Sequence, residues 1–117
     1  MLFSFQHLEV WQSARHLAKE VYSLTRAFPA DERFGLTSQV RRAAVSICCN
    51  LSEGSGRNTS KDQMQFYIIA KASLMEVMNL VILATDFDYL SEQAKENLLR
   101  KGKRLESRIQ ALIRSRQ

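Results

Sequence analysis

The sequence predicts an all-α protein, an antiparallel up-down-up-down four-helix bundle that forms a single domain over residues 1–117. Three observations support this prediction. The 117 residues include one proline and four glycines, so few positions interrupt long helices or favour the tight turns of strand-rich folds. Apolar residues recur every three or four positions in four successive stretches, which is the period of an amphipathic helix. The connections between these stretches are short, and short connections make consecutive helices antiparallel.

The first two helices are expected at about residues 6–28 and 36–54. Pro29 and Gly35 bound the loop between them, because proline disfavours helix in the preceding residue and glycine relaxes the backbone. Gly54 and Gly56 supply a stop after the second helix. The apolar series of the two helices comprise Leu8, Trp11, Ala14, Leu17, Val21, Leu24 and Phe28, followed by Leu36, Val40, Ala43, Ala44, Ile47, Cys48 and Leu51.

The third and fourth helices are expected at about 61–86 and 92–115. Ser60 and Gln63 have the spacing of a capping box, which predicts a helix start near Lys61. Ser91 is the expected N-cap of the last helix, where Glu92 also complements the helix dipole. Apolar residues recur at seven-residue spacing in this helix, at Leu98, Leu105 and Leu112.

The third helix carries two apolar stripes, and the core of a four-helix monomer covers only one side of a helix. Large exposed apolar patches usually mark contacts with another molecule. The second stripe is therefore a candidate oligomer interface; the alternative is a broad core face. Its predicted interface residues are Phe66, Ile69, Val77, Leu80 and Val81.

The formal charge is +5, and residues 91–117 alone hold eight basic and three acidic side chains. A basic helical surface can contact phosphates in a salt-dependent manner with little sequence selectivity. The alternative is a solvated outer face, which is common on helical bundles. The candidate nucleic-acid-binding residues are Arg100, Lys101, Lys103, Arg104, Arg108 and Arg114.

No metal site, cofactor or catalytic centre is expected. His7 and His16 are nine residues apart on one helix and half a turn out of phase. Cys48 and Cys49 are adjacent, which suits neither a structural disulfide nor a redox pair, and Cys48 is expected to face the core. No nucleophile, base and orienting group can be assembled from the sequence. We therefore expect a protein that binds or assembles and is not an enzyme.

Two further expectations concern location and the second loop. The reduced cysteines fit a cytoplasmic protein, and neither a signal peptide nor a long uninterrupted apolar run indicates a membrane segment. The segment 53–61 combines glycines with Arg57 and Lys61 before a helix start, an arrangement that can hold an anion. It lacks the spacing of a phosphate-binding loop, so a plain helix-to-helix linker is the favoured interpretation.

Four segments of the chain together form a specific pattern: Phe5-x-x-Leu8-Glu9-Val10-Trp11-Gln12-x-Ala14, Phe28-Pro29, Phe34-Gly35-Leu36-Thr37-Ser38-Gln39-x-Arg41-Arg42-Ala43-Ala44-Val45-Ser46-Ile47 and Asn50-Leu51-x-Glu53-Gly54-x-Gly56-Arg57. They resemble the four-helix bundle proteins of the 23S ribosomal RNA intervening-sequence family, over nearly the whole chain. The resemblance implies a compact bundle, assembly into a five-membered ring and no known catalytic residue. It also implies an association with RNA or DNA, since a similar bundle accompanies the reverse transcriptase of diversity-generating retroelements and binds nucleic acid and that enzyme. Cys48 stands where the family usually has proline.

The motif residues have two possible roles. They can hold the bundle or its ring together, for example by pairing of arginine with glutamate across helices, or they can bind an anion. These residues are Arg41, Arg42, Glu53, Gly54, Gly56 and Arg57. The sequence thus predicts a homo-oligomer, a pentamer by resemblance, that binds RNA or DNA through its basic surface. The alternative is a scaffold whose assembled ring docks a protein partner.

Overall fold

The computed structural model describes residues 2–117, and within that range it contains helices and no strand. Four α-helices confirm the all-α fold class. Two 3₁₀ helices precede α1 and α2. The bounds are α1 Glu9–Thr25, α2 Leu36–Ser55, α3 Ser60–Asp86 and α4 Glu92–Arg114, with η1 at Ser4–His7 and η2 at Ala30–Glu32.

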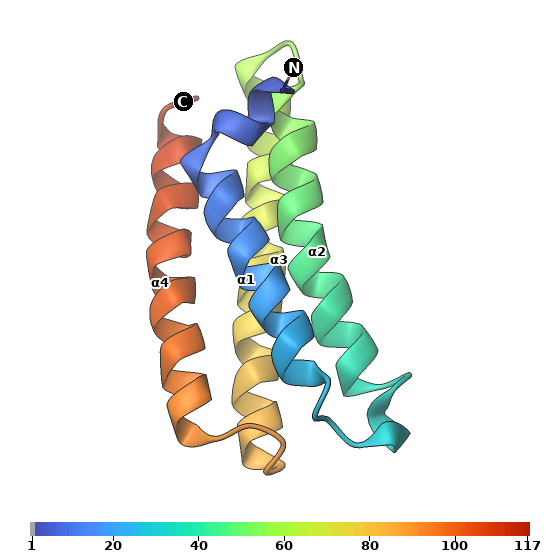
Figure 1. Cartoon of the computed structure of the whole chain (residues 1–117). Coiled ribbons are helices and arrows are strands. Elements are labelled where there is room, and N and C mark those ends of the chain that lie inside the picture. Colours follow the sequence, from blue (N-terminus) through green and yellow to red (C-terminus); the bar gives the residue numbers. More distant parts are fainter. Residues whose placement is uncertain (1) are drawn as a thin grey trace.

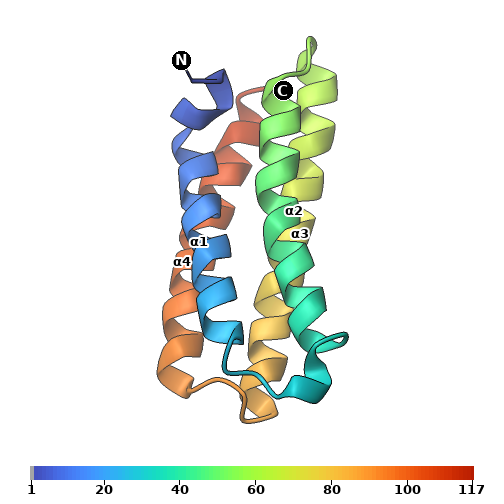
Figure 2. The ribbon, with the colours of Figure 1, turned by 45° about the vertical axis from the view of Figure 1, so that its right-hand side comes forward.

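The four helices stand at the corners of a square in chain order. Each helix packs against the one before and after it, and α1 also packs against α4. Diagonal pairs do not meet, since no Cα atoms of α1 and α3 or of α2 and α4 lie within 8 Å in the described range. The colours of Figure 1 show that the chain direction alternates from helix to helix, and Figure 2 shows the α1–α4 pair beside the α2–α3 pair. The α1–α4 side is therefore opposite the α2–α3 side.

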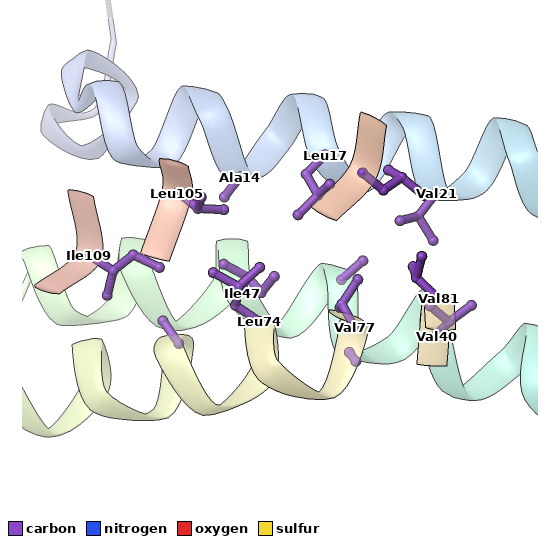
Figure 3. Packing of buried hydrophobic residues seen from close by; sticks show 14 of the residues in the cluster. Ala14, Leu17, Val21, Val40, Ile47, Leu74, Val77, Val81, Leu105 and Ile109 are labelled. Carbon is purple, nitrogen blue, oxygen red and sulfur yellow. The ribbon is translucent and has the colours of Figure 1, made fainter. Parts of the chain in front are cut away.

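A single apolar core runs along the bundle axis. Figure 3 shows Leu17, Ile47 and Leu74 pointing inward from three different helices, with Ile109 of α4 at one end of the cluster. Ile47, Leu74 and Ile109 have no exposed surface. The helical period of each apolar series places these side chains on one face per helix, and burial of a large aliphatic side chain stabilises the fold by about 1.5–3 kcal/mol.

The ends of α1 differ from the expected range of residues 6–28. The first turn is a separate 3₁₀ helix. Leu8, which has an extended backbone with φ −74° and ψ 123°, separates this 3₁₀ helix from α1. At the other end α1 stops at Thr25, whose hydroxyl donates to the carbonyl of Val21 at 2.8 Å. The apolar period continues to Phe28, but this side chain packs against the core from the turn that follows the helix.

The N-cap of α3 differs from the sequence prediction, and the N-cap of α4 agrees with it. The N-cap of α3 is Thr59 and not Ser60, because the Thr59 hydroxyl accepts the backbone N–H of Asp62 at 3.1 Å. The predicted N-cap of α4 is confirmed, since the Ser91 hydroxyl accepts the N–H of Ala94 at 3.1 Å. Such a side-chain cap typically contributes about 1 kcal/mol.

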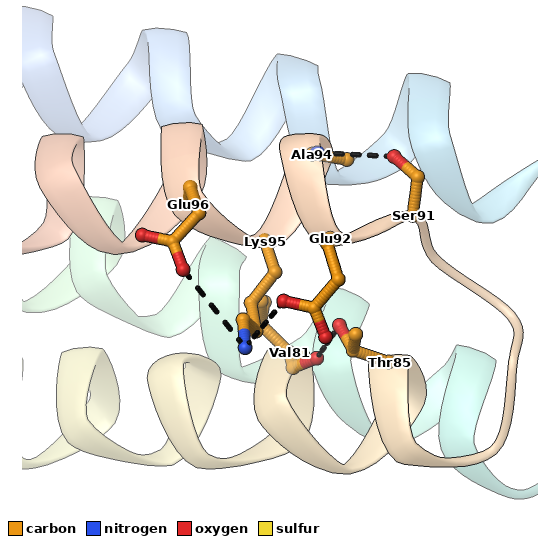
Figure 4. A network of polar contacts seen from close by, with 7 residues as sticks. All are labelled: Val81, Thr85, Ser91, Glu92, Ala94, Lys95 and Glu96. Atoms are coloured by element: carbon orange, nitrogen blue, oxygen red, sulfur yellow. Dashed lines mark hydrogen bonds and ion pairs between the residues drawn. The ribbon is translucent and has the colours of Figure 1, made fainter.

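The start of α4 carries a small charge network, shown in Figure 4. The Lys95 ammonium lies 2.8 Å from a carboxylate oxygen of Glu92 and 4.0 Å from one of Glu96. The hydrogen bond to Glu92 raises the pKa of Lys95 above its ordinary value. This first turn is consequently close to neutral, and the positive charge of α4 lies further along the helix.

The α1–α2 loop is fastened to the α3–α4 loop. The Glu32 carboxylate accepts the backbone N–H of Leu36 at 3.0 Å and the hydroxyl of Tyr89 at 2.9 Å. These bonds, the one from Leu36 foremost, lower the pKa of Glu32. Glu32 thus caps α2 from outside the helix, in place of a side chain that Gly35 at the N-cap does not have.

By length and composition α3 could cross a membrane, since one 18-residue window has a mean hydropathy of 1.7. The sequence pattern did not predict this. Eight residues of α3 are buried in the bundle, and α3 packs against both α2 and α4. A core helix shared between two neighbours is expected to have this composition.

Candidate nucleic-acid interface

The burial of one stripe of α4 forces its basic residues outward. The stripe recurs every three or four residues, so the remaining positions share an arc that faces solvent. All six predicted nucleic-acid-binding residues are exposed on this arc. The buried residues are Leu98, Gly102, Leu105, Ile109 and Ile113.

Two of the six cations have acidic partners. The ammonium of Lys101 lies 2.6 Å from a carboxylate oxygen of Glu20 on α1, and that of Lys103 lies 3.3 Å from Glu106. Exposed pairs of this kind typically contribute less than about 1 kcal/mol. They therefore release their cations to a competing phosphate at little cost.

The other four cations of the predicted set have no acidic partner in the described range. Arg108 donates to the hydroxyl of Ser13 at 2.6 Å, and Arg100 reaches only Asn97, at 3.5 Å. Arg104 and Arg114 form no side-chain hydrogen bond with residues 2–117. Their guanidinium groups are free to bind an external anion.

A basic groove runs between α1 and α4. Its walls carry Lys101, Arg104 and Arg108 from α4 together with Ser13 and His16 from α1, and its volume is about 190 Å³. The floor is apolar, formed by core residues of the two helices. The groove places several hydrogen-bond donors around one space, which suits a phosphate group.

A second basic groove follows the other flank of α4, against α3. Lys103 and Arg114 of α4 line it with Lys71 of α3, and its volume is about 200 Å³. The Lys71 ammonium donates to the side-chain oxygen of Gln110 at 2.7 Å, which directs it toward α4. Sequence reasoning missed Lys71, because the nearest other cation of α3 is Lys61, ten residues earlier in the sequence.

The helix α1 adds cations that sequence reasoning also missed. Arg15 and Lys19 are exposed on α1, and their spacing of four residues places them on one face of the helix. Arg26, directly after the end of α1, is also exposed. Spacing could have identified this row, but only the fold shows that α1 is the neighbour of α4. We call the exposed cations of α1 and α4 together the basic side.

Within the four α-helices, all the exposed large apolar residues except Tyr22 of α1 belong to α2 and α3. On α3, Ile68, Ile69, Met75 and Ile82 are 54%, 47%, 42% and 42% exposed, and we call them the outer face of α3; Val45 on α2 is 40% exposed. Ile68, Met75 and Ile82 recur every seven residues, which keeps them aligned along the helix.

The predicted interface residues on α3 require a correction. Val77, Leu80 and Val81 are core residues with exposures of 0%, 4% and 2%, and Phe66 is only half-buried. Ile69 alone of the predicted set is exposed and belongs to the outer face. Because α3 packs against both α2 and α4, its core face is wider than a single stripe and includes Val77, Leu80 and Val81.

Comparison with known proteins gives a family and a fold. The family described as 23S rRNA-intervening sequence protein matches residues 6–111, nearly the whole chain. The chain belongs to this family. A crystal structure of a protein of unknown function from the S23 ribosomal protein family of Bacteroides thetaiotaomicron is similar, with a TM-score of 0.79 and 17% identity over 89% of this chain and 97% of that one. No curated protein sequence matches significantly.

In this member of the family, Gly54 has a packing role. It is buried on α2, and a Cβ atom there would lie 2.6 Å from Cε1 of Tyr67 and 3.0 Å from Cβ of Phe66. Tyr67 is 1% exposed. The absence of a side chain at Gly54 therefore lets α2 approach α3 closely.

The arginines of the family motif do not pair with glutamate within the chain. Arg41 donates to the Thr25 hydroxyl at 2.7 Å and to the Tyr22 carbonyl at 3.3 Å, and so ties α2 to α1. Arg57 lies over the ring of Phe66 at 4.6 Å. Neither they nor Glu53 form a salt bridge in the described range. Arginine–glutamate pairing across helices, one way in which the motif could hold the bundle together, is therefore absent from residues 2–117.

The remaining motif residues Arg42 and Gly56 lie at the surface of α2. Arg42 donates to the Ser38 hydroxyl at 3.2 Å and lines a polar groove of about 470 Å³ beside Phe34. Gly56 ends α2, and its N–H donates to the carbonyl of Glu53 at 3.1 Å. Gly56 is thus part of the helix stop that the sequence predicts.

Neither cysteine forms a disulfide. Cys48 is half-buried against the core, as predicted, and Cys49 is exposed. Burial raises the pKa of the Cys48 thiol to about 11, so it is protonated and unreactive at neutral pH. Within residues 2–117 no group of three histidine, cysteine, aspartate or glutamate side chains could hold a metal ion.

Proposed function

We propose that this protein binds nucleic acid through its basic side, without catalysis and with low sequence selectivity, and that it assembles with copies of itself. The observation that carries the proposal is the separation of charge from apolar surface. The densest group of exposed cations is on α4, with Arg15 and Lys19 on the neighbouring α1. The exposed apolar residues Val45 and the outer face of α3 belong to the α2–α3 pair, where Arg42 and Lys61 are the exposed cations. Such a separation suits a polyanion on one side and a protein contact on the other.

The charges on the basic side support phosphate binding more than simple solubility. A solvated face usually alternates cations with anions, but residues 100–117 hold seven basic side chains and one acidic one. Two grooves flank α4 and bring further donors from α1 and α3. The family is described by its connection to 23S rRNA, which makes RNA the first polyanion to test.

The outer face of α3 supports self-assembly. Its aligned isoleucines and methionine are exposed to water in a single subunit, and burial of this apolar surface against another subunit would be favourable. A ring of five subunits, which the family resemblance implies, would bury this face and repeat the basic side around its circumference. Repetition raises the positive field and the number of phosphates contacted at once.

Charge reversal tests the nucleic-acid role. Arg104→Glu with Arg108→Glu should weaken the binding of labelled RNA at low salt. The loss of at least two phosphate contacts should also reduce the slope of log K against log salt by about 1.4–1.8 or more. Arg42→Glu with Lys61→Glu is the matched control, because it changes the same charge on the α2–α3 pair. Equal affinity of the Arg104 and Arg108 variant and the unaltered protein would contradict the proposal.

Light scattering tests assembly. The unaltered protein should be oligomeric at micromolar concentration, and Ile68→Glu with Met75→Glu should yield monomers because it buries charge in the contact. Ser107→Glu with Ala111→Glu, on the exposed arc of α4, is the control and should leave the mass unchanged. A monomeric unaltered protein would refute the assembly, and an oligomeric Ile68 and Met75 variant would exclude the outer face of α3 as its interface.

The outer face of α3 also favours a second function, a scaffold that docks a different protein. In that case the positive charge would serve solubility or steering only. Failure to bind RNA or DNA at low salt by an oligomer of intact structure would favour the scaffold over the nucleic-acid role.

A further inference from the structure

We infer that the basic side takes double-stranded nucleic acid, with α4 held between the two phosphate strands. This inference rests on the proposed function and names its ligand class. It comes from three features of α4: two rows of cations on its flanks, small side chains between the rows, and the absence of aromatic side chains for base stacking.

The cations of α4 form two rows. Arg104 and Arg108 lie on the flank toward α1, in the groove with His16, and Lys103 and Arg114 lie on the flank toward α3, in the groove with Lys71. Successive residues of a helix are 100° apart, and a helix with its side chains is about 10–12 Å wide. The two rows are therefore separated by roughly 10 Å, comparable to the groove widths of about 6–12 Å between the strands of a duplex.

Between Lys103 and Arg114 small side chains occupy the crest between the rows, and Arg100, seven residues before Ser107, lies on the same line at the N-terminal end of the crest. Ser107 and Ala111 are exposed at positions one turn apart, and neither projects far beyond the helix backbone. A phosphate strand or groove floor can thus approach the crest while the longer arginines and lysines reach outward on both sides. From Arg100 to Arg114 the helix rises by about 21 Å, long enough for several phosphates on each strand.

The basic side offers no platform for unpaired bases. Proteins that bind single strands usually stack successive bases on exposed aromatic rings. The sequence of α4 contains no aromatic residue. On α1 the one exposed aromatic side chain is Tyr22, and the guanidinium of Arg41 from α2 covers its ring at 4.6 Å. Without base stacking, the contacts of the basic side are to the phosphate backbone of the nucleic acid, and a duplex presents two ordered rows of phosphates.

The experiment compares one sequence in four forms. Fluorescence anisotropy across a salt series would measure binding to a 20-base-pair DNA duplex and to the corresponding RNA duplex. It would also measure binding to one single strand of that DNA and one single strand of that RNA. We expect at least one duplex to bind about tenfold more tightly than either single strand, with a steeper salt dependence. Single strands that bind as tightly as both duplexes would overturn the inference and leave the proposed function intact. No binding of any form would overturn both.

Two double variants test the two rows. Arg104→Gln with Arg108→Gln removes one row, and Lys103→Gln with Arg114→Gln removes the other. Each should flatten the salt slope for the duplex by about 1.8, because each removes two phosphate contacts. Arg42→Gln with Lys61→Gln is the charge-matched control and should leave the slope unchanged. A duplex slope that responds to only one row would overturn the two-strand arrangement.

Discussion

Replacement of Gly54 by alanine tests how closely α2 and α3 pack. Alanine favours helix over glycine by about 0.5–1 kcal/mol. Against this, the new methyl group would lie 2.6 Å from Cε1 of Tyr67 and 3.0 Å from Cβ of Phe66. Tyr67 is 1% exposed, so its ring is enclosed by the core, and overpacking of this kind costs about 1–3 kcal/mol. The net expectation is a destabilisation of about 1 kcal/mol.

Gly102→Ala supplies a matched comparison on α4. This glycine is also buried in a helix, and the atoms that its new methyl group would meet belong to the side chain of Met78. Met78 is half-buried and flexible, so it can move aside. The gain in helix propensity should therefore prevail, and Gly102→Ala should be neutral or stabilising by up to about 1 kcal/mol.

Thermal unfolding followed by circular dichroism, at one fixed protein concentration, would measure the difference. For a chain of this length 1 kcal/mol corresponds to about 4 °C in Tm, so the Gly54 variant should unfold about 4–8 °C below the Gly102 variant. A Gly54 variant as stable as the unaltered protein would refute the close packing of α2 on Tyr67 as the reason for this glycine.

Two further predictions concern titratable groups. Because hydrogen bonds lower the pKa of Glu32 in the folded state, its contribution to stability is present at neutral pH and is lost as pH falls through that lowered pKa. The stability difference between the unaltered protein and Glu32→Gln, measured by urea unfolding, should thus shrink from pH 7 toward pH 3; a constant difference would contradict this. At pH 7.5 a thiol reagent should modify Cys49 quickly and Cys48, whose pKa is about 11, slowly or only on unfolding, and Cys49→Ser should abolish the fast phase. A fast phase that persists in Cys49→Ser would show that Cys48 is reactive.

The sequence predicted the helices well in their interiors and less well at their ends. Periodicity located all four, since burial against a core imposes the same spacing wherever a helix lies. The end of α1 was wrong because apolar residues such as Phe28 pack on the core from a turn as well as from a helix. The cap of α3 was one residue out, because Thr59 and Ser60 are both suitable N-caps and only the backbone geometry distinguishes them.

The candidate site was predicted in part. The six cations of α4 could be recognised because they share one face of a single helix, which local periodicity describes. Lys71 could not, since it shares a groove with α4 only through the packing of two helices. That the cations of α1 lie beside α4 likewise depends on the packing of helices distant in sequence. Val77, Leu80 and Val81 were assigned to an exposed stripe because a sequence does not reveal how many neighbours will cover a helix.

The sequence by itself determined the class of fold, the positions of the helices and the concentration of positive charge in the last of them, because each of these depends on residues close together in the chain. Only the tertiary structure decided which helices are neighbours, which apolar residues of α3 remain exposed, and which cations share a groove. Those features depend on contacts between segments far apart in sequence, and local patterns carry no record of them.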